Sequence, residues 1–248
     1  MPIKTSLNYS PNFSTSARNK KKIKYIVYHY TGMRSENKAI KRLTDLNSNV
    51  SCHYFIKRNG QIILMVPELY EAWHAGISKW KKDISLNKNS IGIEISNPGH
   101  RYKYLKFNKE QIKSVLRLSK HLINKYKIKP KYILGHSDIS PERKIDPGEK
   151  FPWKFLSRRK IGYWHDINQK MLIKGRNQKI TKLDKYIFFK NLKKIGYSVN
   201  LRKKHNKYLI KLISAFQRRF RQEAISGFID KECLIISKNL AKKKIKFS

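Results

Sequence analysis

Apolar residues recur along this chain with two different spacings, one typical of strands and one typical of helices. Four short apolar segments resemble buried strands: 23–29, 52–57, 61–66 and 90–96. Segments 36–46 and 108–126 instead place their apolar residues on one face of a helix. Strands interleaved with helices predict an α/β fold, with a central mixed β-sheet flanked by helices.

Local signals mark the ends of some of these elements. Asn59-Gly60 separates two of the predicted strands, and this dipeptide favours a tight hairpin turn. Asn108 followed by Gln111 resembles a capping box, which predicts the start of the long helix there.

The composition of the chain changes after Pro152-Trp153, where the sequence becomes polar and basic and loses its regular apolar spacing. We therefore expect a first domain over residues 1–156, a polar linker over 157–180 and a small all-α domain of three helices over 181–248. The clearest C-terminal helix has an apolar face made by Leu209, Leu212, Ile213, Phe216 and Phe220. Its arginines are predicted to lie away from that face: Arg218, Arg219 and Arg221.

The 248 residues include 57 Lys and Arg against 16 Asp and Glu, a formal net charge of +41. Such an excess raises the possibility of nucleic-acid binding. The positive charge is spread over both halves of the chain, however, and accompanies abundant Asn and Ile. A mutational bias in the coding sequence would produce that mixture without any selection for a polyanionic partner, and we favour this interpretation.

Cysteines and apolar runs restrict the class of protein further. Cys52 and Cys233 lie far apart in the sequence, which excludes a disulfide scaffold. No apolar run approaches the roughly 18–20 residues that span a bilayer. Residues 1–22 lack the apolar core of a signal peptide, so we expect a cytoplasmic protein without a transmembrane segment, with the periplasm, reached by another export route, as the alternative.

Polar residues follow or interrupt the predicted strands at places where active-site groups commonly lie. His29 ends the first strand, Glu94 interrupts an apolar strand, and His136 and Asp146 lie in the region after a further short strand expected at 132–134. Two imidazoles and one carboxylate suit a catalytic zinc ion, which keeps a fourth position open for water. Glu94 would then accept a proton from that water, and Lys144 would stabilise an oxyanion.

Chain spacing alone leaves other interpretations open. His136 and Asp138 form a His-x-Asp pair that would also bind a metal, and Asp146-Pro147-Gly148 alone is a turn sequence. His53 and His74 are further candidates for which we favour structural roles. Glu94 is harder to explain structurally, because a carboxylate in an apolar strand is costly to bury unless it is paired or functional.

Taken in order, these residues form a series of motifs similar to those of a known family. The motifs are Tyr25-Ile26-Val27-Tyr28-His29-Tyr30-Thr31, Ser51-Cys52-His53-Tyr54, Ala72-Trp73-His74-Ala75-Gly76, Ser90-Ile91-Gly92-Ile93-Glu94-Ile95, Gly135-His136-Ser137-Asp138-Ile139 and Arg143-Lys144-Ile145-Asp146-Pro147-Gly148. Together they resemble the type-2 N-acetylmuramoyl-L-alanine amidase family. The start of the chain and its C-terminal extension resemble the AmiD branch of that family.

The resemblance implies a zinc hydrolase that cuts the amide between N-acetylmuramic acid, in its ordinary or 1,6-anhydro form, and the L-alanine of a peptidoglycan stem peptide. It assigns one zinc ion per chain to His29, His136 and Asp146, and catalytic roles to Glu94 and Lys144. It places His74 at the substrate groove. The C-terminal segment is similar to a three-helix peptidoglycan-binding domain.

The expected partners are therefore peptidoglycan fragments, or muropeptides, and no specific nucleic acid. Two other hypotheses compete with the amidase interpretation. A peptidoglycan-binding protein without activity is disfavoured by the presence of Glu94 and Lys144. A basic nucleic-acid-binding protein is the third hypothesis, and it predicts tight binding that weakens steeply with salt.

Overall fold

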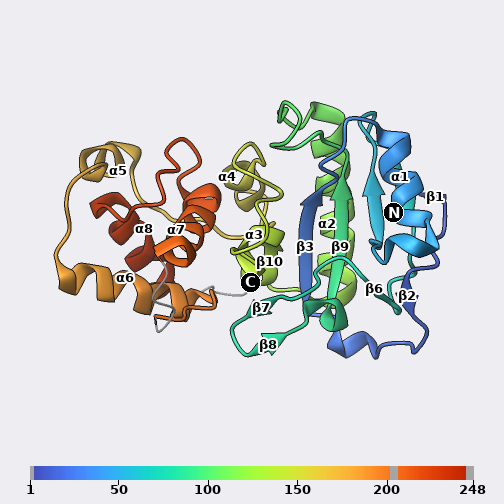
Figure 1. Ribbon diagram of the computed structural model, residues 1–248, viewed down its shortest axis with the longest axis horizontal. Coiled ribbons are helices and arrows are strands. Elements are labelled where there is room, and N and C mark those ends of the chain that lie inside the picture. The colour runs from blue at the N-terminus through green and yellow to red at the C-terminus, as the bar shows by residue number, and fades with distance from the viewer. Residues whose placement is uncertain (1–2, 202–205, 244–248) are drawn as a thin grey trace.

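The structure is a computed structural model that describes residues 3–201 and 206–243. Parts of the predicted C-terminal domain, 202–205 and 244–248, lie outside the described residues. The sheet and its covering helices occupy one end of the molecule, and a group of C-terminal helices occupies the other (Figure 1). The predicted α/β fold with a mixed sheet is confirmed.

The described part of the chain has one six-stranded sheet in the order β1-β5-β4-β9-β3-β10. In that order, the strands are Ser6–Leu7, Ile62–Leu64, Tyr54–Ile56, Ser90–Ile95, Tyr25–Tyr30 and Ile133–Gly135. Only the β4–β5 pair is antiparallel within this sheet. These two strands form the hairpin predicted around Asn59-Gly60, and Gly60 has a positive φ of 85°.

Smaller elements surround this sheet. Two further strand pairs are β2 (Phe13–Ser14) with β6 (Glu71–Ala72), and β7 (Lys79–Trp80) with β8 (Asp83–Ile84). Four 3₁₀ helices lie among the described residues: Lys20–Lys22, Leu46–Ser48, Leu86–Asn89 and Pro130–Tyr132. Among the described residues, no helix combines the length and apolar character that a membrane crossing requires.

Helices α1 (Glu36–Thr44) and α2 (Lys109–Tyr126) cover opposite faces of the sheet. Leu118 and the rest of the apolar face of α2 share a hydrophobic cluster with Ile91, Ile93 and Ile95 of β9. Leu43 of α1 packs in another cluster with alternate residues of the neighbouring strands. Because side chains of a strand alternate between faces, Glu94 lies on the face away from α2, as predicted.

The predicted capping box at the start of α2 is present. The Asn108 side chain accepts a hydrogen bond from the Gln111 backbone N–H at 2.9 Å, and the Gln111 side chain accepts one from the Asn108 N–H at 3.2 Å. These bonds satisfy two backbone donors that the first turn of a helix leaves free. The helix therefore begins where its sequence predicts.

The C-terminal part contains the three predicted helices, α6 (Lys182–Ile195), α7 (Asn206–Phe220) and α8 (Lys231–Lys242). They follow the short helices α3 (His136–Ile139), α4 (Trp153–Ser157) and α5 (Gln169–Gly175). The segment expected as a linker thus includes α5, and its Ile161 and Leu172 are buried. The domain boundaries themselves stay a prediction.

The C-terminal helices and the sheet share one hydrophobic cluster. Val27 of β3 and Leu134 of β10 belong to the same cluster as Phe188 of α6 and Phe216 of α7. Trp80 and Tyr197 make an edge-to-face ring contact within it, with centroids 4.9 Å apart. The helices therefore pack directly against the part of the chain that carries the sheet.

Arg219 lies outside the apolar stripe of α7, yet it is not exposed to solvent. It is only 2% exposed and forms an ion pair with Asp138. Its guanidinium also donates to the Ile133 carbonyl at 2.8 Å and lies 4.0 Å from the Trp153 ring. Phe216 of the apolar stripe contacts Phe188 of α6, with ring centroids 5.2 Å apart, whereas Arg219 contacts β10 and α3, so α7 is packed on two sides.

Candidate active site

Three neighbouring parallel strands bring distant residues to one edge of the sheet. The pairing of β3 with β9 places His29 directly opposite Glu94. The pairing of β10 with β3 places Gly135 opposite Tyr28, so His136, the next residue, begins α3 beside His29. Polar side chains thus gather at the carboxyl ends of the strands, where parallel sheets commonly bind ligands.

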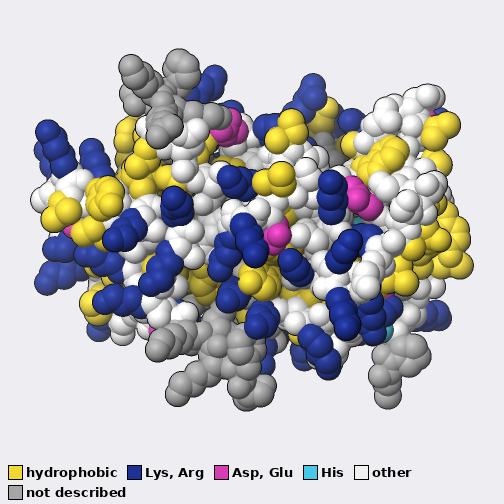
Figure 2. Space-filling view, turned by 90° about the horizontal axis from the view of Figure 1, so that it is seen from below, with side chains coloured by type: hydrophobic (Ala, Val, Ile, Leu, Met, Phe, Trp, Pro, Cys, Tyr) yellow, Lys and Arg dark blue, Asp and Glu magenta, His cyan; other side chains and the backbone are white. Residues whose placement is uncertain are grey.

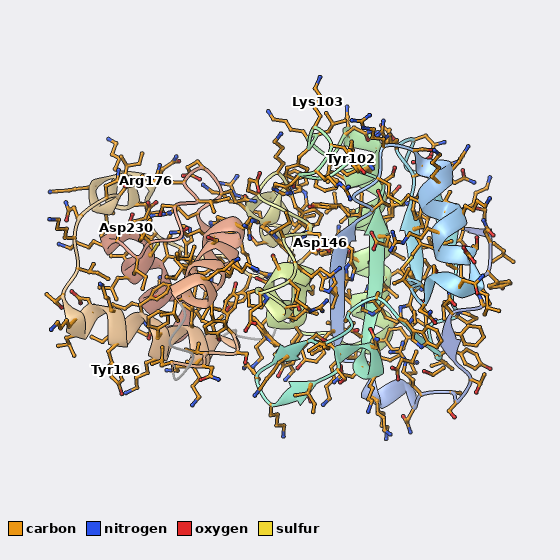
Figure 3. All side chains as sticks on the ribbon, in the orientation of Figure 1. Tyr102, Lys103, Asp146, Arg176, Tyr186 and Asp230 are labelled. Carbon is orange, nitrogen blue, oxygen red and sulfur yellow. The ribbon has the colours of Figure 1, made fainter. Side chains whose placement is uncertain are left out.

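The side chains of His29, His136 and Asp146 meet at one point. The two Nδ1 atoms of the histidines are 2.9 Å apart, and each lies 3.1 Å from Oδ2 of Asp146. The loop that carries Asp146 is fixed to α3 by a 2.8 Å hydrogen bond from the Ser137 N–H to the Asp146 carbonyl. Figure 3 shows Asp146 on the side of β3 nearer to the C-terminal helices.

The chemistry of this donor group fits a metal ion. Burial lowers the pKa of His29 to about 4, so its imidazole is neutral at neutral pH. Burial alone would raise the pKa of Asp146, but the adjacent imidazoles of His136 and His29 hold it below its ordinary value. Converging lone pairs and one negative charge attract a cation, and within the described residues this is the one such group found.

Hydrogen bonds to the outer ring nitrogens orient the two histidines. Nε2 of His136 lies 3.1 Å from the carbonyl of Ala75, an acceptor that leaves Nδ1 free of hydrogen. Nε2 of His29 lies 3.0 Å from Nδ1 of His74. The segment around Ala75 is held in turn by Arg143, which donates to the carbonyl of Ile77 at 2.8 Å.

Glu94 and Lys144 border the same cleft, which has a volume of about 370 Å³. Oε2 of Glu94 is buried and has no hydrogen-bond partner among the described residues. Burial and, to a smaller extent, the Asp146 carboxylate raise the pKa of Glu94, whereas the ammonium of Lys144 lowers it, and together they place it at about 8. A buried carboxyl group with such a pKa, beside these three donor side chains, is suited to proton transfer.

Further residues line the cleft that the sequence did not single out for chemistry. They include Thr31, Met33, Arg42, Val50, Ser51 and Trp73. Arg42 lies on α1, where its charge had no distinguishing context among so many basic residues. Gly92 carried a readable signal, because a glycine inside a strand often marks a close approach by another group.

Other candidate ligands lie elsewhere. The carboxylate of Asp138 binds Arg219 and accepts hydrogen bonds from Tyr197 at 2.6 Å and from the Gly135 N–H at 2.8 Å. It therefore faces away from the donor group, and the His136–Asp138 alternative has no support. His53 is fully buried, and its Nδ1 accepts a hydrogen bond from the Gly92 N–H at 3.0 Å.

Known amidases are similar to this chain in sequence. The family model for N-acetylmuramoyl-L-alanine amidase matches residues 19–149. N-acetylmuramoyl-L-alanine amidase AmiD of Escherichia coli is 35% identical over 236 residues, which cover 90% of this chain and 83% of AmiD. The 1,6-anhydro-N-acetylmuramyl-L-alanine amidase AmpD of Escherichia coli is 38% identical but matches only 42% of this chain and 55% of AmpD.

Solved structures extend the likeness to the fold. Escherichia coli AmiD, in complex with the substrate anhydro-N-acetylmuramic acid-L-Ala-D-γ-Glu-L-Lys, superposes with a TM-score of 0.79, 34% identity and coverage of 92% of this chain and 91% of AmiD. AmpDh3 of Pseudomonas aeruginosa superposes with a TM-score of 0.77, 29% identity and coverage of 93% and 95%. The chain therefore belongs to the N-acetylmuramoyl-L-alanine amidase family.

Proposed function

We propose that this chain is a zinc-dependent N-acetylmuramoyl-L-alanine amidase that acts on muropeptides, including those with 1,6-anhydro-N-acetylmuramic acid. Its reaction is hydrolysis of the amide that joins the muramic acid lactyl group to the L-alanine of the stem peptide. The observation that carries the proposal is the convergence of three donor side chains next to a buried carboxylate with a free oxygen. Escherichia coli AmiD, similar over most of the chain, has been solved with an anhydromuropeptide substrate.

His29, His136 and Asp146 would hold the zinc ion through two Nδ1 atoms and one carboxylate oxygen. Zinc supplies Lewis acidity, which polarises a carbonyl and makes bound water easier to deprotonate. Neutral imidazoles and a carboxylate are the donor types expected of a catalytic zinc site.

Glu94 acts as the general base and acid in this proposal. Glu94 lines the cleft that the donor group also borders, and its Oε2 has no hydrogen-bond partner among the described residues, so it can accept a proton from water and return it to the leaving amine of L-alanine. Lys144, on the same cleft wall, supplies a positive charge that stabilises the oxyanion formed at the scissile carbonyl.

Electrostatics favour an anionic substrate. Arg42 and Arg143 line the cleft, and stem peptides carry carboxylates. Figure 2 shows a face of the molecule on which Lys and Arg greatly outnumber Asp and Glu. This surface should speed the encounter with negatively charged fragments by an attraction that salt weakens.

Hydrolysis of purified anhydromuropeptide, followed by chromatography and mass spectrometry, tests the proposal. We expect release of free stem peptide and the anhydro sugar, loss of turnover after the metal is removed with a chelator, and recovery after zinc is added. A parallel reaction with ordinary muropeptide measures the preference for the anhydro form. Unchanged turnover by metal-free protein would refute the zinc proposal.

Two expectations from the sequence stay predictions. The peptidoglycan-binding role of residues 181–248 can be tested by sedimenting the Glu94→Gln variant with insoluble peptidoglycan, which separates binding from hydrolysis. The cytoplasmic location can be tested by cell fractionation with an antibody against the chain.

A further inference from the structure

His74 lies directly behind His29, on the opposite side from the metal-binding group. The Nδ1 atom of His74 is 3.0 Å from Nε2 of His29, and the two rings meet edge to face with centroids 5.1 Å apart. His74 is only 8% exposed. Since His29 presents Nδ1 to His136 and Asp146, its Nε2 is the nitrogen that remains for His74.

The hydrogen bonds behind His29 are consistent with a single direction of donation. A ring nitrogen that binds a cation carries no hydrogen, so His29 holds its hydrogen on Nε2 and donates it to Nδ1 of His74. His74 then carries its hydrogen on Nε2, which lies 3.0 Å from Oγ of Ser90. The Ser90 hydroxyl donates at 2.5 Å to the Leu86 carbonyl, which can only accept.

The position of the His74 ring is tightly determined by its surroundings. A Cβ atom on Gly92 would lie 2.3 Å from Cγ of His74, so only glycine leaves room for the ring at this point of β9. On the other side, Oδ1 of Asn87 accepts hydrogen bonds from the backbone N–H groups of His74 at 3.2 Å and Ala75 at 2.7 Å. Both the ring and its backbone are therefore fixed.

We propose that His74 is a positioning residue, which holds His29 in the tautomer and orientation that expose the Nδ1 lone pair to the metal, and that Ser90 fixes His74 in turn. This inference rests on the zinc site of the proposed function. His74 also lines the cleft, but both of its ring nitrogens have protein partners, so we expect it to make no hydrogen bond to the substrate through its ring. His136 is oriented by the adjacent carbonyl of Ala75, so residues 74 and 75 together position both histidine ligands.

A matched pair of variants separates positioning from packing. In His74→Asn, the side-chain carbonyl oxygen replaces Nδ1 as the acceptor for His29. In His74→Leu, a side chain of similar bulk offers no acceptor. Zinc affinity is measured on the full chain by competition with a chromophoric chelator, without substrate, and the thermal midpoint of each variant is recorded alongside.

We expect His74→Leu to weaken zinc binding about 10- to 100-fold, the range typical for loss of a hydrogen-bonding partner of a ligand. His74→Asn should stay within a few-fold of the wild type, and Ser90→Ala should fall between the two. Equal affinities in the Leu and Asn variants, whether both reduced or both unchanged, would overturn the inference.

Nitrogen-15 NMR of the zinc-loaded wild type gives a second test that needs no variant to fold. We expect the His74 hydrogen on Nε2, and a hydrogen on Nδ1 would overturn the assigned direction. The wild-type zinc affinity is measured first. If the wild type binds no zinc, the proposed metal site fails, whereas wild-type binding with equal variants refutes only the role of His74.

Discussion

Arg219 makes a buried ion pair between α7 and the segment that carries His136, and its removal is the sharpest test of how the helical part supports the catalytic part. Arg219 and Asp138 are 2% and 1% exposed, respectively. In Arg219→Met, much of the side-chain volume is kept, but the guanidinium is lost together with its hydrogen bonds to Asp138 and the Ile133 carbonyl and its contact with the Trp153 ring.

The expected magnitude follows from what Asp138 retains. Removing one partner of a buried ion pair costs about 3–5 kcal/mol, because the other charge is left uncompensated. Asp138 would keep its hydrogen bonds from Tyr197 at 2.6 Å and from the Gly135 N–H at 2.8 Å. We therefore expect the free energy of unfolding to fall by about 3 kcal/mol, at the lower end of that range.

Urea denaturation followed by tryptophan fluorescence measures this change. The exposed Arg117 on α2 provides a control, and Arg117→Met should change the free energy of unfolding by no more than about 0.5 kcal/mol. A double-mutant cycle with Asp138→Asn isolates the pair. Once residue 138 is neutral, loss of Arg219 should cost markedly less than it does in the wild type.

A loss below about 1 kcal/mol in Arg219→Met, or strictly additive effects of the two substitutions, would refute this reasoning. Either result would mean that water or a neighbouring group compensates Asp138 after the arginine is removed. The ion pair would then contribute little to holding α7 against the sheet.

Three further predictions address catalysis, acid stability and packing. Glu94→Gln should lower kcat by about 10²–10⁴-fold with zinc affinity nearly unchanged. Lys144→Met should also lower kcat, and both variants are assayed with anhydromuropeptide. A normal rate in Glu94→Gln would exclude Glu94 as the general base. Burial would raise the pKa of Glu68, but hydrogen bonds from Lys125, Tyr126 and Tyr54 lower it below its ordinary value of 4.5. The ionised Glu68 therefore stabilises the fold above pH 4.5, and this contribution is lost as the pH falls through the folded-state pKa. Over that acidic range, the urea midpoint of the wild type should decline more steeply than that of Glu68→Gln. Parallel profiles of the two proteins would count against the role of Glu68. Gly196→Ala should lower the thermal midpoint, because a Cβ there would lie 2.3 Å from the Trp80 ring at a φ of 146°; an unchanged midpoint would show that the ring can move.

Local sequence patterns predict elements well here but say little about which elements meet. The apolar alternation around His29 and Glu94 marks two strands and the face that each side chain takes. Their direct pairing across β3 and β9 depends on contacts between segments some sixty residues apart, to which a local pattern is blind. Resemblance to a family predicts which distant residues lie close together, because the members of a family share the same site.

Arg219 shows where periodicity misleads. Its position off the apolar stripe of α7 is predicted correctly, but a polar residue away from a stripe need not face solvent. A second packed surface buries it against Asp138, and the ion pair compensates for the lost hydration. The sequence of α7 alone contains no sign of that second surface, because the acid that pairs with Arg219 lies 81 residues earlier.

Asp138 and His136 lie on the same short helix, α3, which therefore connects the C-terminal helices with the candidate active site. His136 belongs to the donor group that it forms with His29 and Asp146, while Asp138 is held by Arg219 of α7 and by Tyr197. The Gly135 N–H donates a hydrogen bond to the Asp138 carboxylate, so the same carboxylate also holds the backbone that precedes His136. We therefore expect the C-terminal helices to influence the site through the orientation of α3, which Arg219 contacts.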